Sequence, residues 1–359
     1  MIIISNKRRA DWAEVNGNGY RYRVTTPNLT ARLAAAAIAL ASPIALAACG
    51  SSSEPAASST TASAAAGGTC PTAPIKVVVS VDQWGDVVSQ LGGACATVTT
   101  VLAGSSVDPH DYEPAPSDAT LFDGAQLVVL NGGHYDEWAA KLAASSDPDA
   151  PVINAVDLSG GGDHGGGDHA EAGGDHGADH VEEGNPHVWY SPAVVGEVAK
   201  AVTAELKKLS PGASAYFDER YTGFTNVMKP YDNEIAAIKA GAAGKSYAAT
   251  ESVFDDMAAA LGLENRTPEG YRLASANESE PAPADLDAFL RLLGDRKVDV
   301  LIYNTQTEGS VVEQIRAAAE QAGVPVVDVT ETVPPNTESF QTWQVEQLTS
   351  LAKALGVRE

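Results

Sequence analysis

The sequence is poor in basic residues and in cysteine, and both scarcities narrow its function. Among 359 residues, 23 Lys and Arg face 47 Asp and Glu, which gives a net charge of −24. Most of this acidity serves solubility, but it also argues against nucleic acid and anionic lipid headgroups as direct partners and favours cations. The three cysteines lack the close spacing of a cysteine-based zinc site. No His-Glu-x-x-His motif occurs, which disfavours a zinc hydrolase.

The amino-terminal segment indicates export. Residues 33–48 form an apolar run that is too short and interrupted for a comfortable membrane span and ends in small residues, as a secretory signal does. Its end, Leu46-Ala-Ala-Cys49-Gly50, resembles the lipobox of bacterial lipoproteins and implies cleavage before Cys49 and lipidation of its sulfur. The alternative is a cysteine buried in an alanine-rich helix. Residues 1–23 are unusual for a signal, so Val24 is one candidate for the true initiator.

The segment that follows predicts a tether between a lipid anchor and a globular body. Residues 49–69 begin with the lipidated Cys49 and continue with Ser, Ala, Thr and Gly, a composition that cannot bury a core. Two acyl chains would hold the protein stably at the membrane. Removal of residues 1–48 takes away six basic and two acidic side chains and leaves 17 basic and 45 acidic ones, a net charge of −28.

Six of the seven histidines lie in three places, and this pattern predicts metal capture. His110 follows Asp108-Pro109, and His187 follows Asn185-Pro186. Residues 160–184 form a Gly-rich tract with four Asp-His pairs, whose histidines are His164, His169, His176 and His180. Imidazole is a favoured ligand of borderline metals, zinc above all. The tract is either a solvated loop or a solvated loop that also binds metal weakly.

Short apolar runs alternate with longer amphipathic stretches, which predicts an α/β fold with parallel sheets and covering helices. The expected strands cover residues 75–81, 98–102, 127–130, 152–154, 246–250, 271–274, 300–303 and 324–329. The expected helices cover residues 85–91, 117–122, 138–144, 192–209, 253–261, 283–296, 311–322 and 339–355. Each half of the chain therefore contributes four strands.

The segment from Pro211 to about Ala243 interrupts this alternation. Its apolar and aromatic residues recur at helical spacing, and Pro230 either kinks one long helix or separates two. We expect one long helix, with or without a kink at Pro230, that joins two lobes. The predicted organisation is a signal peptide at 1–48, a tether at 49–69, an amino-terminal lobe at 70–209 that includes the His-rich loop 160–184, a linking helix at 210–244 and a carboxy-terminal lobe at 245–359.

Two further expectations follow from the order of the elements. Cys70 and Cys95 each precede an expected strand, and two cysteines outside the membrane usually pair, so we expect a disulfide between them. Ligands of open α/β sheets bind beyond the carboxyl ends of the strands. Glu251 and Glu331 follow expected strands, His110 follows the strand that ends near residue 102, and His187 precedes a helix. All four side chains could therefore face one cleft.

These motifs resemble those of the zinc and manganese substrate-binding lipoproteins of ABC transporters. The resemblance covers residues 74–356 and rests on residues 108–118 (DPHDYEPAPSD), 130–138 (LNGGHYDEW), 185–189 (NPHVW), 251–257 (ESVFDDM) and 277–281 (NESEP). It implies two four-stranded lobes joined by a long helix, with one metal ion in the cleft. It further implies a monomer, lipid-anchored to the outer face of the bacterial cytoplasmic membrane, that delivers metal to a membrane permease driven by a cytoplasmic ATPase.

Carried over by motif, the metal ligands fall on His110, His187, Glu251 and Glu331, with Asp328 as a substitute for Glu331 if the register slips. At the third position zinc-preferring relatives often have His and manganese-preferring relatives often have Glu, whereas a His-rich loop is typical of zinc members. Two imidazoles and two carboxylates tolerate manganese or iron, but raw affinity favours zinc. We expect transported Zn²⁺, with Mn²⁺ (or iron) as the alternative and no enzymatic activity; a metallohydrolase and a passive surface metal buffer are the other classes.

Overall fold

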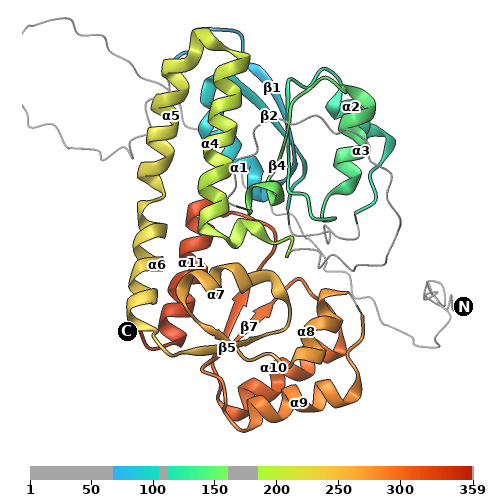
Figure 1. The fold of residues 1–359 in the computed structure, drawn as a ribbon, viewed down its shortest axis with the longest axis vertical. Coiled ribbons are helices and arrows are strands. Elements are labelled where there is room, and N and C mark those ends of the chain that lie inside the picture. The colour runs from blue at the N-terminus through green and yellow to red at the C-terminus, as the bar shows by residue number, and fades with distance from the viewer. Residues whose placement is uncertain (1–67, 105–111, 161–184, 278, 358–359) are drawn as a thin grey trace, which may run out of the picture. The chain divides into compact units, whose positions relative to one another are not determined.

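The computed structural model describes residues 68–104, 112–160, 185–277 and 279–357. All of them belong to one unit, residues 62–359. Within it, two separate four-stranded parallel sheets each carry helices (Figure 1). Among the described residues, no helix combines the length and the apolarity needed to cross a membrane.

The amino-terminal sheet has the strand order β2-β1-β3-β4. Its strands are β1 (Ile75–Val81), β2 (Ala96–Leu102), β3 (Leu127–Leu130) and β4 (Val152–Asn154). Its helices are α1 (Asp82–Gly92), α2 (Pro116–Phe122), α3 (Glu137–Ser146) and α4 (Pro192–Leu209). Successive strand residues point to opposite faces. Val77 and Val79 therefore pack with α1 and α4, whereas Val78 packs with α2 and α3.

The carboxy-terminal sheet repeats this plan in the order β6-β5-β7-β8. Its strands are β5 (Ser246–Ala249), β6 (Glu264–Asn265), β7 (Val300–Asn304) and β8 (Val326–Val329). Its helices are α7 (Asp255–Leu261), α8 (Glu269–Ala276), α9 (Pro283–Gly294), α10 (Ser310–Ala322) and α11 (Phe340–Ala354). Tyr247 and Ile302 face the core shared with the other lobe, whereas Leu301 faces a separate cluster with Phe289 and Ile315.

One strand was assigned wrongly from the sequence. Residues 271–274 belong to helix α8, and the fourth strand of this sheet is the two-residue β6. Tyr271 packs edge-on against Phe289 at 4.8 Å, while Leu273 on the other side of the helix is 48% exposed. A run of four residues is too short to separate a strand from a helix by periodicity, and Pro268 just before it is a helix-start signal that outweighs the apolar run.

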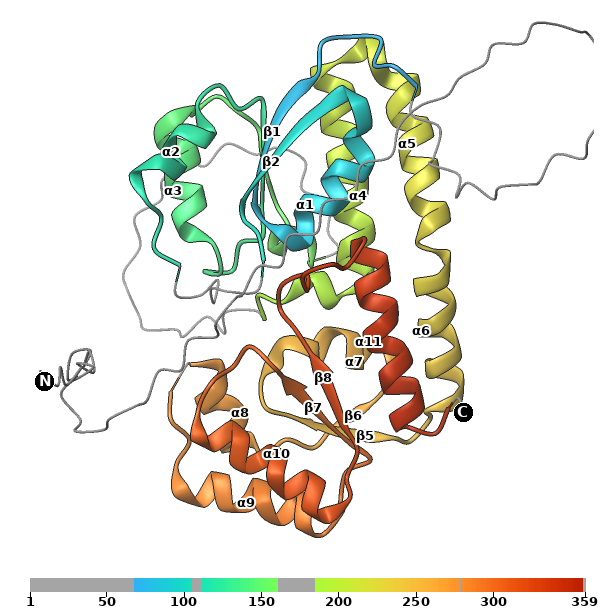
Figure 2. The same cartoon turned by 180° about the vertical axis from the view of Figure 1, so that it is seen from behind.

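The linking segment is helical but interrupted. A 3-10 turn at Pro211–Ala213 leads into α5 (Ser214–Val227), which is followed by α6 (Lys229–Gly241). Met228 between them keeps helical backbone angles (φ −75°, ψ −13°). The expected single helix is thus two helices in succession, since Pro230 lacks the N–H that would continue the hydrogen bonds. Figure 2 shows α5 beside the amino-terminal lobe, where it contacts α1 and α4, and α6 beside α11 of the other lobe.

The two lobes share one hydrophobic core. The largest cluster of buried side chains includes Trp84 of α1, Trp189 of the segment before α4 and Trp343 of α11, each no more than 1% exposed. Tyr190 of the amino-terminal lobe packs on Trp343 at 5.8 Å and on Phe254 at 5.2 Å. The predicted disulfide is present: Cys70 and Cys95 are bonded, with their Cα atoms 5.0 Å apart.

Candidate metal centre

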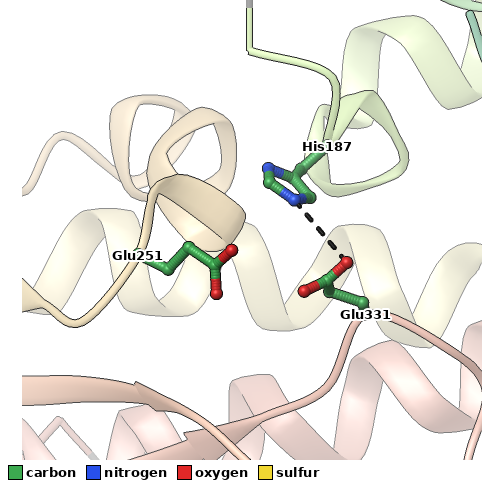
Figure 3. Close-up of side chains that lie close together, drawn as sticks. All are labelled: His187, Glu251 and Glu331. Atoms are coloured by element: carbon green, nitrogen blue, oxygen red, sulfur yellow. Dashed lines mark ion pairs between the residues drawn. The ribbon is translucent and has the colours of Figure 1, made fainter. Parts of the chain in front are cut away.

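Three of the predicted ligands meet where the lobes face each other. Glu251 lies two residues beyond β5, and Glu331 lies two residues beyond β8. These strands flank β7 in the sheet, so their carboxyl ends open at the same edge. His187 comes from the other lobe, at the start of the short 3-10 helix Val188–Tyr190 that leads into α4. Figure 3 shows its ring directed toward the two carboxylates.

The three side chains are close enough to share one ion. One ligand atom from each of His187, Glu251 and Glu331 lies within 4.8 Å of the other two. His187 Nε2 is 3.7 Å from Glu331 Oε2. His187 and Glu331 are each 2% exposed, and Glu251 is half-buried. Carboxylates so close together repel one another, and a bound cation would relieve that repulsion.

Asn185 fixes which imidazole nitrogen faces the cluster. Its Nδ2 donates to the carbonyl of Ser252 at 3.0 Å, and its Oδ1 accepts from the backbone N–H of His187 at 3.2 Å. The amide orientation is therefore settled, and Oδ1 is the atom that lies 2.7 Å from His187 Nδ1. Because Oδ1 only accepts, Nδ1 carries a proton, and in the neutral ring Nε2 is the nitrogen with the lone pair.

A second set of contacts holds the loop in front of His187. Asn131 Nδ2 donates to the carbonyl of Pro186 at 2.8 Å, and Asn131 Oδ1 accepts from the indole of Trp84 at 3.0 Å. Asp136 in turn accepts the backbone N–H groups of Asn131 and Gly132 at 2.7 and 2.8 Å. Burial raises the pKa of Asp136, opposed by these hydrogen bonds and one from Ser80. The motif at residues 130–138 thus positions the Asn-Pro-His loop.

Glu331 is held from the opposite lobe as well as from its own. Gln83 of α1 donates to the Glu331 carbonyl at 2.7 Å and to Tyr135 Oη at 3.1 Å. Tyr135 donates to Glu331 Oε2 at 3.4 Å. Within the carboxy-terminal lobe, Gln306 Oε1 accepts the backbone N–H of Glu331 at 2.7 Å. The position of this carboxylate therefore depends on both lobes at once.

The last residue of β7 and the turn that follows it connect the two carboxylates. Asn304 Nδ2 donates to Glu251 Oε2 and to Glu331 Oε1, both at 2.7 Å. Thr307 Oγ1 donates to Glu251 Oε2 as well. Asn304 is 1% exposed, so these bonds form away from water. β7 lies between β5 and β8 in the sheet, which places Asn304 between the two glutamates.

The structure separates Glu331 from its predicted substitute. Asp328 lies on the exposed side of β8, and its carboxylate contacts Arg316 Nη1 at 2.5 Å and Nη2 at 3.3 Å. It therefore points away from His187 and Glu251. His110 lies outside the described residues, as do the loop histidines His164, His169, His176 and His180 and the predicted lipidation site Cys49.

Sequence reasoning did not identify the residues that orient the ligands. Asn185 and Tyr135 lie in motifs that also contain a histidine, but the sequence did not indicate that they orient metal ligands. Asn304 and Thr307 follow the strand at residues 300–303, and a polar cluster just after a buried strand is the signal that could have found them. Gln83 left no such signal, because its partners lie 52 and 248 residues away.

Comparison with known proteins settles the family. The model of the family described as "Zinc-uptake complex component A periplasmic" (ZnuA) matches residues 77–354. The chain belongs to this family. Its two-lobe architecture of paired parallel sheets agrees with the expected fold.

Individual relatives of this ZnuA-family chain are distant. The high-affinity zinc uptake system protein ZnuA of Bacillus subtilis (strain 168) is 25% identical over 219 residues, 60% of this chain and 66% of that protein. The zinc-binding lipoprotein AdcA of Streptococcus pneumoniae is 23% identical over 242 residues, 66% of this chain and 45% of that protein. The matches thus span less than two thirds of each relative's own length.

Solved structures confirm the fold. The solute-binding protein FpvC of Pseudomonas aeruginosa, in complex with Mn²⁺, superimposes with a TM-score of 0.62. It is 21% identical and covers 79% of this chain and 98% of its own. At this identity the likeness shows the shared ZnuA-type architecture alone.

The donor set in this ZnuA-family chain fits a divalent transition metal. One imidazole nitrogen and two carboxylates suit zinc, manganese or iron. None of these three side chains supplies a soft sulfur ligand. The fixed tautomer of His187 and the hydrogen-bonded glutamates are the outer contacts that such sites require.

Proposed function

We propose that this protein is the extracytoplasmic solute-binding component of an ABC importer, which captures zinc between its lobes and delivers it to a membrane permease driven by an ATPase. One observation carries the proposal: His187, Glu251 and Glu331 converge from two lobes with ligand atoms within 4.8 Å of one another. Membership of the zinc-uptake component A family and the names of its relatives support it.

The ligands act by binding and release rather than by chemistry on a substrate. His110, carried over by motif, supplies the second imidazole and completes a set of four donors. Four protein ligands leave no open position for a reactive water, as a catalytic zinc site needs. The site therefore suits transport and argues against the metallohydrolase alternative.

Zinc is the proposed cargo, with manganese as the alternative. The second carboxylate at Glu251 makes the donor set harder and is the observation that favours manganese; FpvC, which shares the fold, was solved with Mn²⁺. Against this, an N/O site of given geometry binds zinc more tightly than manganese.

The remaining parts of the chain have roles in this proposal. Lipid attached to Cys49 anchors the protein outside the membrane, and residues 49–69 let the body reach a permease. The histidines of residues 160–184 collect zinc weakly and raise its local concentration near the deeper site. These roles rest on the sequence, since the residues lie outside the described part of the structure.

Calorimetric titration tests the proposal. We expect the purified protein to bind one zinc ion tightly, to keep that site when residues 160–184 are deleted, and to lose it in His187→Ala. Manganese should bind much more weakly in the same buffer. Equal or tighter manganese binding would establish the alternative cargo, and no tight site for either ion would reject the transport role. Genes for a permease and an ATPase beside this one would support delivery to an importer.

A further inference from the structure

The side chain of Asn304 can present only its amino group to the carboxylates. Asn304 Oδ1 accepts the backbone N–H of Gln306 at 3.1 Å. That bond fixes the orientation of the amide, so Nδ2 is the atom between Glu251 and Glu331. Thr250 strengthens the arrangement, because its Oγ1 accepts the backbone N–H of Asn304 at 3.2 Å.

The two N–H groups of this amide are shared between two acids. An amide nitrogen has two hydrogens, and Glu251 Oε2 and Glu331 Oε1 each lie 2.7 Å from it, closer than its third neighbour, Thr307 Oγ1, at 2.9 Å. The hydroxyl of Thr307 donates to that same oxygen of Glu251. One oxygen of each carboxylate thus accepts hydrogen bonds from this part of the chain: Glu251 Oε2 from Asn304 and Thr307, and Glu331 Oε1 from Asn304. The other oxygen of Glu331, Oε2, lies 3.7 Å from His187 Nε2 and accepts only the longer, 3.4 Å hydrogen bond from Tyr135.

We propose that Asn304, with Thr307, restricts Glu251 and Glu331 to one coordinating oxygen each and thereby selects zinc over manganese. The inference rests on the proposed function, whose cargo it narrows. Zinc is satisfied by four ligands in a tetrahedron. Manganese prefers octahedral oxygen coordination, which two bidentate carboxylates would help to supply. Because Asn304 and Thr307 hydrogen-bond to one oxygen of each glutamate, those oxygens are less available as the additional metal ligands that manganese needs.

Asn304 also reduces the repulsion between Glu251 and Glu331 in the metal-free site. Two buried like charges disfavour each other, and the partial positive charge of the amide N–H groups reduces that cost. Because the amide is anchored through Oδ1 and its backbone N–H, it holds the carboxylates in place without moving itself. Asn304 and Thr307 are therefore positioning residues that act on the metal through the glutamates.

Cobalt absorption and metal competition test this role in the purified full chain. Four-coordinate Co²⁺ absorbs visible light strongly, and five- or six-coordinate Co²⁺ absorbs weakly. We expect strong bands in the unmodified protein and bands severalfold weaker in Thr307→Val and Asn304→Leu. In competition titrations the ratio of manganese to zinc affinity should rise about tenfold in both variants, as expected for loss of a contact behind a ligand.

Two control variants separate this effect from general disturbance. Thr307→Ser keeps the hydroxyl and should restore the unmodified spectrum. Thr305→Val makes the same change two residues away, where the exposed Thr305 donates to the Val329 carbonyl at 3.3 Å instead of to a carboxylate. It should leave both the spectrum and the affinity ratio unchanged. If circular dichroism shows that Asn304→Leu does not fold, Thr307→Val decides the matter.

The outcomes distinguish this inference from the proposed function. Weak cobalt bands in an unmodified protein that still binds zinc tightly would overturn the coordination role and leave zinc capture intact. A Thr307→Val variant with unmodified spectrum and affinity ratio would also overturn it. Failure of the unmodified protein to bind zinc or cobalt at all would instead reject the proposed function.

Discussion

Asn185 Oδ1 accepts the backbone N–H of His187 and lies 2.7 Å from the Nδ1 atom of the same residue. One carbonyl oxygen thus sets both the path of the main chain and the tautomer of the ring. The proposed ligand, Nε2, has its lone pair available only because the opposite nitrogen is protonated. Asn185 should therefore contribute to metal binding by orienting His187, although it is not itself one of the proposed ligands.

Asn185→Ala should weaken zinc binding by ten- to about a hundredfold, the range measured when partners of metal-ligating histidines are removed. The ring would lose its fixed tautomer, while the fold should change little. Calorimetry or competition with a chelating dye measures the affinity. Asn226→Ala, at an exposed position of α5, is the matched control and should bind zinc normally. An unchanged affinity in Asn185→Ala would show that the tautomer is held by other means.

Zinc should raise the thermal stability of the protein, and Glu331→Gln should abolish the increase. A ligand at a hundredfold its dissociation constant stabilises the folded state by about 2.7 kcal/mol. Calorimetric melting with zinc and with excess chelator measures the difference. The metal-free variant should melt no lower than the metal-free parent, since a carboxylate that repels Glu251 has been neutralised. Glu338→Gln, an exposed neighbour, should retain the full zinc effect.

Asp299 should contribute stability that disappears in acid. It accepts hydrogen bonds from Lys245 Nζ at 2.9 Å, from the Ser246 backbone N–H at 2.8 Å and from Ser246 Oγ at 3.1 Å. Burial alone would raise its pKa, but these donors together outweigh burial and hold the pKa below its usual value. The folded state therefore binds this proton less tightly than the unfolded state, and the stabilisation is complete above about pH 4 and lost as pH falls through the folded pKa.

Urea denaturation between pH 3 and pH 6 measures this term. At pH 6, Asp299→Asn should lower the free energy of unfolding by about 1–3 kcal/mol, as expected for lost hydrogen bonds to a charged group. The difference from the parent should shrink toward pH 3. Asp295→Asn provides the control, because the ion pair of Asp295 with Lys297 is exposed and such pairs contribute little. A difference that stayed constant with pH would contradict the assignment.

Loss of the disulfide should destabilise the protein without changing the metal site. Cys70→Ser with Cys95→Ser removes a bond that closes a loop of 25 residues, at an expected cost of about 2–4 kcal/mol. Cys95 lies beyond the carboxyl end of α1, whereas Gln83 contacts Glu331 from its first turn. Zinc affinity at 25 °C should therefore stay within about twofold of the parent. A large loss of affinity would mean that the disulfide controls the position of α1.

The sequence predicted the elements with strong local signals. The strands at 75–81, 127–130 and 152–154 and the helix at 192–209 have the bounds expected. Predominantly apolar runs define the first two strands, and Pro192 after the capping Ser191 defines the helix. β6 could not be found, because its two residues are exposed and carry no apolar pattern.

In the candidate site, too, some residues could be predicted from local sequence signals and others could not. Glu251 and Glu331 were expected at one edge of the sheet because each follows a buried strand, and the structure places them there with His187. Their roles as ligands, and that of His110, stay predictions. Asn304 lies between them because β7 pairs with both neighbouring strands, a tertiary relationship that no local pattern encodes. Long-range contacts of polar side chains are the part of a site that sequence periodicity cannot reveal.

The tryptophan core that runs through both lobes has a consequence for how the protein fails. Trp84, Trp189 and Trp343 belong to one continuous cluster, so each sheet keeps only the smaller cluster on its outer face once the other lobe has lost its order. The molecule should therefore unfold in a single thermal transition. A substitution that disrupts packing in one lobe should also destabilise the other lobe. Heat or proteolysis that unfolds one lobe should then also disrupt the proposed metal site, because its ligands come from both lobes.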